Sequence, residues 1–154
     1  MRFKNVSVLT RNIMAGRTGG PRTRNSKRWT EAKYRSFIRG NLRRTSTRWA
    51  PIGDCLKAAR VARGLYLCAG CGQTVEASIK VNGRRVKNVH VDHINPIVDP
   101  SVGFVSWDVL IERMFCEADN LQLLCNECHT NKTNLEKAIA KDRRLKNKEE
   151  DEDD

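Results

Sequence analysis

Four of the six cysteines form two pairs with the pattern Cys-x-x-Cys: Cys68 with Cys71, and Cys125 with Cys128. Two thiolates separated by two residues can bind one metal ion from a tight turn, and two such pairs complete a tetrahedral zinc site. Gly70 and Gly72 suit the sharp turn that the first pair requires. Because four thiolates fill the coordination shell, we expect a structural zinc with no open position for chemistry. A redox pair would need a thioredoxin-like βαβ context, which the sequence does not indicate.

A second set of polar residues is interleaved with the cysteine pairs. Asp92 and His93 are adjacent, Asn120 precedes the second pair, and His129 follows it directly. A neutral imidazole, with an unperturbed pKa of ~6.5, can accept a proton from water near neutral pH. We interpret His90, two residues before Asp92, as a surface or supporting histidine rather than a metal ligand.

The order Cys-x-x-Cys, Asp-His, Asn and Cys-x-x-Cys-His resembles the HNH endonuclease family, especially its small phage-type members with a four-cysteine zinc site. The resemblance covers about residues 65–135 and implies a ββα-metal fold that hydrolyses DNA phosphodiester bonds with a divalent cation. It further implies that Asp92 and His129 bind the catalytic metal, that His93 is the general base, and that Asn120 orients His93. Adjacent strand residues point to opposite sides, so Asp92 can face a metal while His93 faces the phosphate.

The expected catalytic site has one carboxylate and one imidazole as metal ligands. Such a site leaves positions for water and phosphate oxygens, which suits Mg²⁺ or Mn²⁺ and tolerates Ni²⁺. Two features depart from the family pattern. Thr133 stands where some members have a further histidine, and 26 residues separate His93 from Asn120, which is a long spacing for this motif.

Positive charge is concentrated in the first third of the chain. Residues 1–50 carry a net charge of +13, residues 51–148 carry +4, and the acidic residues 149–154 carry −6. The total of +11 favours a polyanionic partner, and we expect double-stranded DNA. We expect residues 1–29 to be a disordered basic arm, because residues 17–28 have no large apolar side chain to bury.

Between this arm and an acidic tail at residues 147–154, we expect a basic helical segment at residues 30–64 and a nuclease domain at residues 65–146. A helix should begin near Thr30, and a second short helix should run from Asp54 to Gly64. We expect five arginines of this segment to contact DNA: Arg35, Arg39, Arg43, Arg60 and Arg63.

The nuclease domain alternates strand and helix patterns. The Asn82-Gly83 pair predicts a hairpin between strands at residues 75–81 and 85–91. The apolar spacing at residues 107–115 predicts a helix capped by Ser106, and residues 121–124 and 127–146 should form a strand and a helix. We therefore expect an α+β protein, with a small ββα-metal nuclease core, a structural zinc, and N-terminal basic helices and arm.

These features predict a metal-dependent DNA endonuclease that nicks or cuts both strands. A zinc-ribbon DNA-binding protein without catalysis explains the charge and the cysteines equally well, but leaves Asp92, His93 and His129 without a purpose. A third interpretation keeps the nuclease and makes it an accessory of a phage DNA-packaging terminase. Because no apolar run has the length of a signal peptide or a membrane span, we expect no membrane partner and a location in the cytoplasm, that of the host if the gene is a phage's.

Overall fold

The computed structural model describes residues 20–152. The chain divides into two compact units, Met1–Gly40 and Asn41–Asp154, and the second contains every cysteine, histidine and other residue of the expected zinc and catalytic sites. The described part of the expected acidic tail is helical, because the last helix continues to Glu152.

The described part of the first unit is a small hairpin that leads into a helix. Strands β1 (Arg22–Arg24) and β2 (Trp29–Thr30) pair antiparallel, and α1 (Glu31–Ser46) begins in this unit and ends in the second. Helix α1 confirms the helix expected from about Thr30. The hairpin lies in the segment that we expected to be disordered, where an ion pair of 2.7 Å joins Arg24 to Glu31. The rest of the expected arm, residues 1–19, lies outside the described residues.

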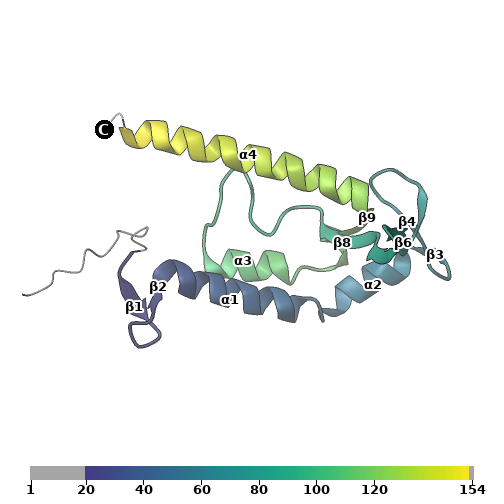
Figure 1. The fold of residues 1–154 in the computed structure, drawn as a ribbon, viewed down its shortest axis with the longest axis horizontal. Coiled ribbons are helices and arrows are strands. Elements are labelled where there is room, and N and C mark those ends of the chain that lie inside the picture. Colours follow the sequence, from purple (N-terminus) through teal and green to yellow (C-terminus); the bar gives the residue numbers. More distant parts are fainter. Residues whose placement is uncertain (1–19, 153–154) are drawn as a thin grey trace, which may run out of the picture. The chain divides into compact units, whose positions relative to one another are not determined.

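The second unit contains three further helices and three small sheets (Figure 1). Its elements up to the first helix after Asp92 and His93 are α2 (Ala50–Ala58), β3 (Arg60–Ala62), β4 (Leu65–Leu67), β5 (Thr74–Glu76), β6 (Ser78–Val81), β7 (Arg84–Lys87), β8 (Val89–His93) and α3 (Trp107–Met114). A 3₁₀ turn, η1 (Ala118–Asn120), then leads into β9 (Leu121–Cys125) and α4 (Asn126–Glu152). The fold is thus mixed α and β, as expected.

Helix α2 differs from the helix expected over residues 54–64. It begins at Ala50, before Pro51. Proline is compatible with the first turn of a helix, because the N–H that it lacks has no partner there. It ends at Ala58, so Arg60 lies on strand β3 and Arg63 in the turn that follows. The prediction that these two arginines share a helix was wrong.

The expected hairpin around Asn82-Gly83 is shorter than predicted. Both turn residues have positive φ angles, 49° and 77°, as this turn type requires. The ladder covers only β6 and β7, and a hydrogen bond of 2.9 Å from Asn88 N to Ala77 O closes its base. Asp92 and His93 therefore do not lie on a hairpin strand but on β8, which pairs with β9.

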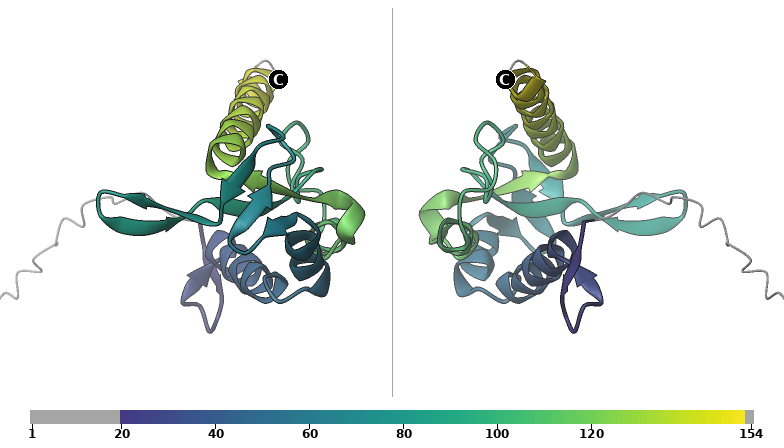
Figure 2. Two further views of the ribbon diagram at one scale, coloured as in Figure 1. Left: turned by 90° about the vertical axis from the view of Figure 1, so that its right-hand side faces the viewer. Right: turned by 90° about the vertical axis from the view of Figure 1, so that its left-hand side faces the viewer.

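Strands β8 and β9 are antiparallel, and α4 follows β9 without a loop (Figures 1 and 2). In their register, Asp92 lies opposite Gln122 and His93 opposite Leu121. Leu123 on β9 is almost fully buried, as are Leu110 and Met114 on α3. Helix α3 and its Ser106 cap confirm the prediction, since Ser106 Oγ accepts a hydrogen bond of 3.2 Å from Val109 N. In the part of the chain that is described, no helix is long and apolar enough to cross a bilayer.

Candidate metal centre and active site

The four cysteines of the two Cys-x-x-Cys pairs come together in one cluster. Each offers a sulfur atom, and all four sulfur atoms lie within 4.8 Å of one another. In a tetrahedral zinc site the Zn–S distance of ~2.3 Å places neighbouring sulfurs about 3.8 Å apart, so the cluster fits zinc with a small contraction. The structure therefore provides a four-cysteine site that could hold a structural metal such as zinc.

The turn that carries the first pair is fixed by backbone contacts. Gly72 has a φ of 69°, and its N–H donates a hydrogen bond of 2.9 Å to Cys68 O. A hydrogen bond of 2.8 Å from Ala69 N to Leu123 O attaches this turn to β9. At Gly70, a Cβ atom would lie 3.0 Å from both Cβ and Sγ of Cys128. Glycine at this position lets the two pairs approach closely enough to share one ion.

Backbone N–H groups prepare Cys68 for metal binding. Burial raises the pKa of the Cys68 thiol, but N–H donors, of which Cys125 contributes one at 3.2 Å, outweigh burial and lower the pKa to about 6. The lowered pKa favours the thiolate of Cys68, which is the form that binds metal. Cys55 and Cys116 lie outside the cluster and are half-buried free thiols.

A second cluster joins β8 to the first turn of α4. Asp92 Oδ1 lies 3.9 Å from His129 Nε2, and both side chains are partly shielded from solvent. Two ligands about 2.1 Å from an octahedral ion lie about 3.0 Å apart in adjacent positions and about 4.2 Å apart in opposite ones. The observed separation falls between these limits, so this carboxylate and imidazole can bind the same ion.

His90 packs against His129. The two imidazole rings are stacked, with centroids 4.6 Å apart and planes inclined by 19°. Burial lowers the pKa of His90, and the nearby positive charge of Lys87 lowers it further. His90 thus acts as a neutral aromatic surface that fixes the ring of His129.

Lys132 belongs to this cluster, although sequence reasoning missed it. Its ammonium group lies 2.8 Å from Asp92 Oδ2 and 2.6 Å from Glu136 Oε1, and it donates a hydrogen bond of 2.8 Å to His93 O. Burial lowers the pKa of Lys132, but the two carboxylates outweigh it and raise the pKa above its ordinary value. Helical spacing could have indicated that Lys132 lies near the site, because it follows His129 by three residues and shares its face of α4.

His93 lies on the other side of β8 from Asp92, as strand alternation requires. It is half-buried, and its Nε2 lies 3.4 Å from Met114 O at the end of α3. A neutral imidazole that donates from Nε2 to this carbonyl keeps Nδ1 unprotonated and able to accept a proton.

Asn120 holds the backbone directly after His93. Its Oδ1 accepts a hydrogen bond of 2.9 Å from Asn95 N, its Nδ2 donates one of 3.3 Å to Asn95 O, and its carbonyl accepts one of 2.9 Å from Ile94 N. Although 26 residues separate His93 from Asn120 in the sequence, the pairing of β8 with β9 brings them close together, because His93 lies opposite Leu121.

The five arginines expected to contact DNA are all exposed, but they are divided between the two units. Arg35 and Arg39 belong to the first unit, and Arg43, Arg60 and Arg63 belong to the second. Arg35 also lies 3.5 Å from Glu31, in an exposed ion pair that contributes little stability.

No family model, curated protein or solved structure matches this chain. The residue types in the two clusters and their geometry are therefore the grounds for a functional assignment.

Proposed function

We propose that this protein is a metal-dependent HNH endonuclease that hydrolyses phosphodiester bonds in double-stranded DNA. One observation carries the proposal: β8, β9 and α4 place Asp92 3.9 Å from His129, with His93 adjacent on the strand and facing the other side. A metal ligand pair beside a potential general base is what phosphodiester hydrolysis requires.

Asp92 and His129 would hold the catalytic divalent cation, Mg²⁺ or Mn²⁺, with Ni²⁺ tolerated. When bound, such a cation stabilises the charge that develops on the phosphate and on the leaving oxygen. Lys132 holds Oδ2 of Asp92 and leaves Oδ1 facing His129, so the carboxylate offers one oxygen to the ion.

His93 would accept a proton from the attacking water through Nδ1. The carbonyl of Met114 favours the required tautomer, because it can accept a hydrogen bond only from a protonated Nε2. Asn120 would keep the His93 ring in place through its three hydrogen bonds to the two residues that follow His93.

The four-cysteine cluster would bind zinc for stability rather than for catalysis. It connects the turn after β4 to the end of β9 and the first turn of α4, the same elements that position His129. A zinc-ribbon DNA-binding protein would also use this cluster, but it would have no use for the partly buried contacts among Asp92, His129 and Lys132.

The proposal is tested by cleavage of supercoiled plasmid DNA with Mg²⁺ or Mn²⁺. We expect His93→Ala to lose activity about 10²- to 10⁴-fold, since general-base catalysis contributes that much. Zinc content and duplex binding, measured on the same preparations, should stay at the level of the wild type. Wild-type protein that binds DNA but does not cleave it with either metal would refute the proposal and favour the DNA-binding alternative.

A further inference from the structure

The hairpin formed by β6 and β7 is exposed on both of its faces. Each residue from 79 to 87 is exposed, including the apolar side chains of Ile79, Val81 and Val86. Among the described strands, none pairs with either edge of this hairpin. An isolated two-stranded ribbon is marginally stable in water, so a surface of this kind is typical of an element that binds a partner.

The register of the hairpin separates its side chains by chemistry. Cross-strand partners lie on the same face, and the pairs alternate between the two faces. One face carries Ser78, Lys80, Arg85 and Lys87, and the other carries Ile79, Val81, Arg84 and Val86. The hairpin therefore has four positive charges, no acidic residue, and three cations on a single face.

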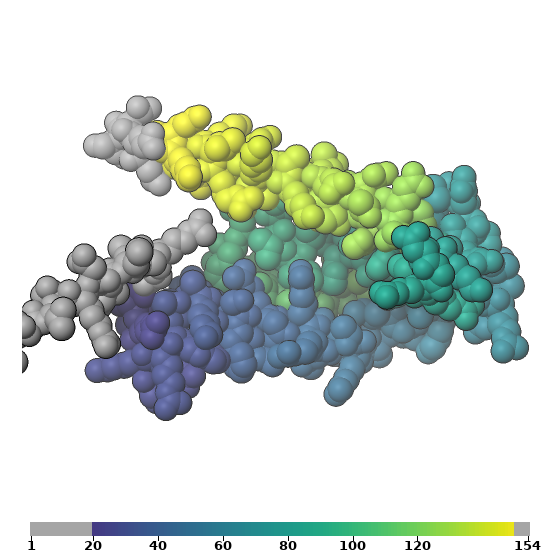
Figure 3. Space-filling model, in the orientation of Figure 1, coloured from purple at the N-terminus to yellow at the C-terminus, as the bar shows by residue number. Residues whose placement is uncertain are grey.

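The base of the hairpin is fixed to the elements that carry the candidate active site. Asn88 donates hydrogen bonds to Ala77 O at 2.9 Å and to Glu76 O at 3.0 Å, and its carbonyl accepts one of 2.9 Å from Asn126 N. Asn88 thereby connects the hairpin to the first residue of α4, and β8 begins at the next residue. Figure 2 shows the hairpin reaching outward from this base, and Figure 3 shows its side chains as a knob below the first turns of α4.

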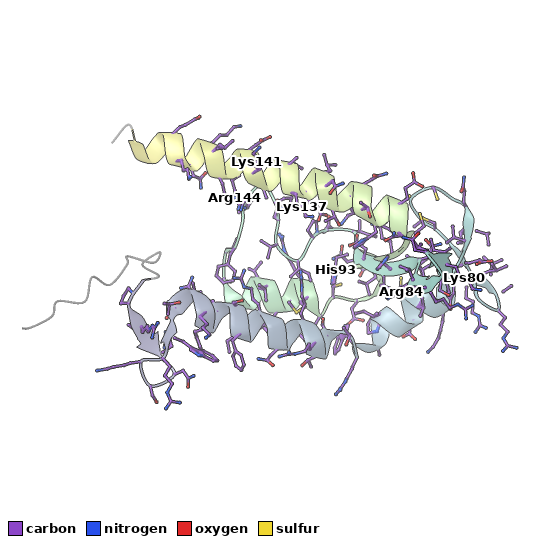
Figure 4. All side chains as sticks on the ribbon, viewed as in Figure 1. Lys80, Arg84, His93, Lys137, Lys141 and Arg144 are labelled. Atoms are coloured by element: carbon purple, nitrogen blue, oxygen red, sulfur yellow. The ribbon has the colours of Figure 1, made fainter. Side chains whose placement is uncertain are left out.

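Helix α4 carries a second row of cations within the same unit. Four exposed residues recur at intervals of four, three and four positions and so share one face of the helix: Lys137, Lys141, Arg144 and Lys148. At 1.5 Å per residue, the row begins about 12 Å along the helix from His129. In the view of Figure 4, His93 lies between the labelled cations of α4 and those of the hairpin, Lys80 and Arg84.

We propose that the β6–β7 hairpin is a ribbon that enters the major groove of duplex DNA and holds the substrate beside the candidate active site. The inference rests on the proposed function. The major groove, ~12 Å wide, admits a two-stranded ribbon whose strands are ~4.8 Å apart. Lys80, Arg85 and Lys87 contact phosphates, while the opposite face offers apolar side chains to thymine methyl groups.

The test measures the affinity of the full chain for a short labelled duplex, by fluorescence anisotropy over a salt series without added Mg²⁺ or Mn²⁺. The hairpin variant combines Lys80→Ser, Arg85→Ser and Lys87→Ser. Because each neutralised phosphate contributes about 0.9 to the slope of log K against log [salt], its slope should flatten by about 2.7. Relative to a 1 M salt reference, this corresponds at ~0.1 M salt to an affinity loss of about 500-fold.

A control variant removes the same charge from exposed cations outside the hairpin and the row on α4: Arg48→Ser, Lys57→Ser and Lys146→Ser. Its slope of log K against log [salt] should stay close to that of the wild type. Both variants should match the wild type in zinc content and melting temperature. A single-stranded oligonucleotide lacks the groove, so the hairpin variant should lose less affinity for it than for the duplex. Equal losses for the two variants, or for the two kinds of DNA, would overturn the inference.

Plasmid cleavage separates this inference from the proposed function. If the wild type cleaves plasmid and the hairpin variant binds duplex as tightly as the wild type, the inference is wrong and the nuclease assignment stands. If duplex binding depends on the hairpin but no metal supports cleavage, the inference holds and the nuclease assignment fails.

Discussion

The ammonium group of Lys132 lies 2.8 Å from Oδ2 of Asp92, while the other carboxylate oxygen faces His129 at 3.9 Å. Lys132 therefore fixes the orientation of the carboxylate without occupying the oxygen that would bind a metal ion. The raised pKa of Lys132 keeps it charged at neutral pH, so this contact persists there. Groups that orient a metal ligand in this way commonly affect metal affinity as well as activity.

We expect Lys132→Met to lower the affinity for Mn²⁺ and the rate of cleavage, by about 10- to 100-fold, because Asp92 loses the group that orients it. Glu136→Gln should have a smaller effect, since an amide at this position can still accept a hydrogen bond from Lys132. The measurements are Mn²⁺ binding by calorimetry and cleavage as a function of Mn²⁺ concentration. Lys146→Met serves as the control on the same helix. A Lys132 variant with wild-type Mn²⁺ binding would exclude this role.

His90 and His129 are expected to respond differently to the same substitution. His90→Phe retains an aromatic ring against His129 and should leave cleavage within about tenfold of the wild type, since the supporting surface remains. His129→Phe removes the proposed metal ligand and should reduce cleavage by more than about 100-fold. Plasmid cleavage at saturating Mn²⁺ compares the two variants. If His90→Phe were as inactive as His129→Phe, His90 would have to be counted among the ligands.

Features with a local cause could be predicted from the sequence. The turn at Asn82-Gly83 needs positive φ angles, and the cap at Ser106 needs only a hydroxyl group at the start of a helix. The four-cysteine cluster could also be predicted, because a shared metal brings distant pairs together whatever the intervening fold.

Features that depend on long-range pairing could not be predicted. Strand β8 pairs with β9, although residues 94–120 separate the two strands in the sequence. The local sequence pattern therefore assigned the first residues of β8 to the second strand of the preceding hairpin. Lys132 was missed because its contact with Asp92 depends on how the first turns of α4 pack against β8. Pro51 resembles a helix breaker in the sequence, although its position in the first turn of α2 makes it compatible with the helix.

The zinc assignment predicts that the two classes of cysteine differ. Cys125→Ser should abolish zinc binding and the cooperative thermal transition, because the free energy of binding a structural zinc, ~10–16 kcal/mol in zinc-finger peptides, is also folding free energy. Cys55→Ser is the matched control, since Cys55 is a half-buried free thiol outside the cluster, and it should retain both properties. Elemental analysis and circular dichroism melts provide the measurements. Wild-type protein that melts cooperatively without bound zinc would contradict the assignment.

Two glycine-to-alanine substitutions test whether the close approach of the cysteine pairs is a steric requirement. A Cβ atom at Gly70 would lie 3.0 Å from both Cβ and Sγ of Cys128, and 3.2 Å from a methyl group of Leu124. Because these neighbours belong to β9 and the first turn of α4, they cannot move without displacing the cluster. Gly70→Ala should therefore weaken zinc binding and destabilise the fold by about 1–3 kcal/mol, which is typical of overpacking.

Gly53→Ala is the matched control for this steric prediction. Gly53 lies inside α2, where an added Cβ atom would have no neighbour within 4 Å, and its φ angle is not positive. Alanine there should stabilise the protein by up to about 1 kcal/mol, because it is the better helix former. Urea denaturation of the zinc-loaded protein, with a competitive chelator titration for zinc affinity, distinguishes the two variants. Equal stability and zinc affinity for both would mean that the turn at Gly70 has room for a side chain, and that the cysteine pairs do not depend on this contact to share one ion.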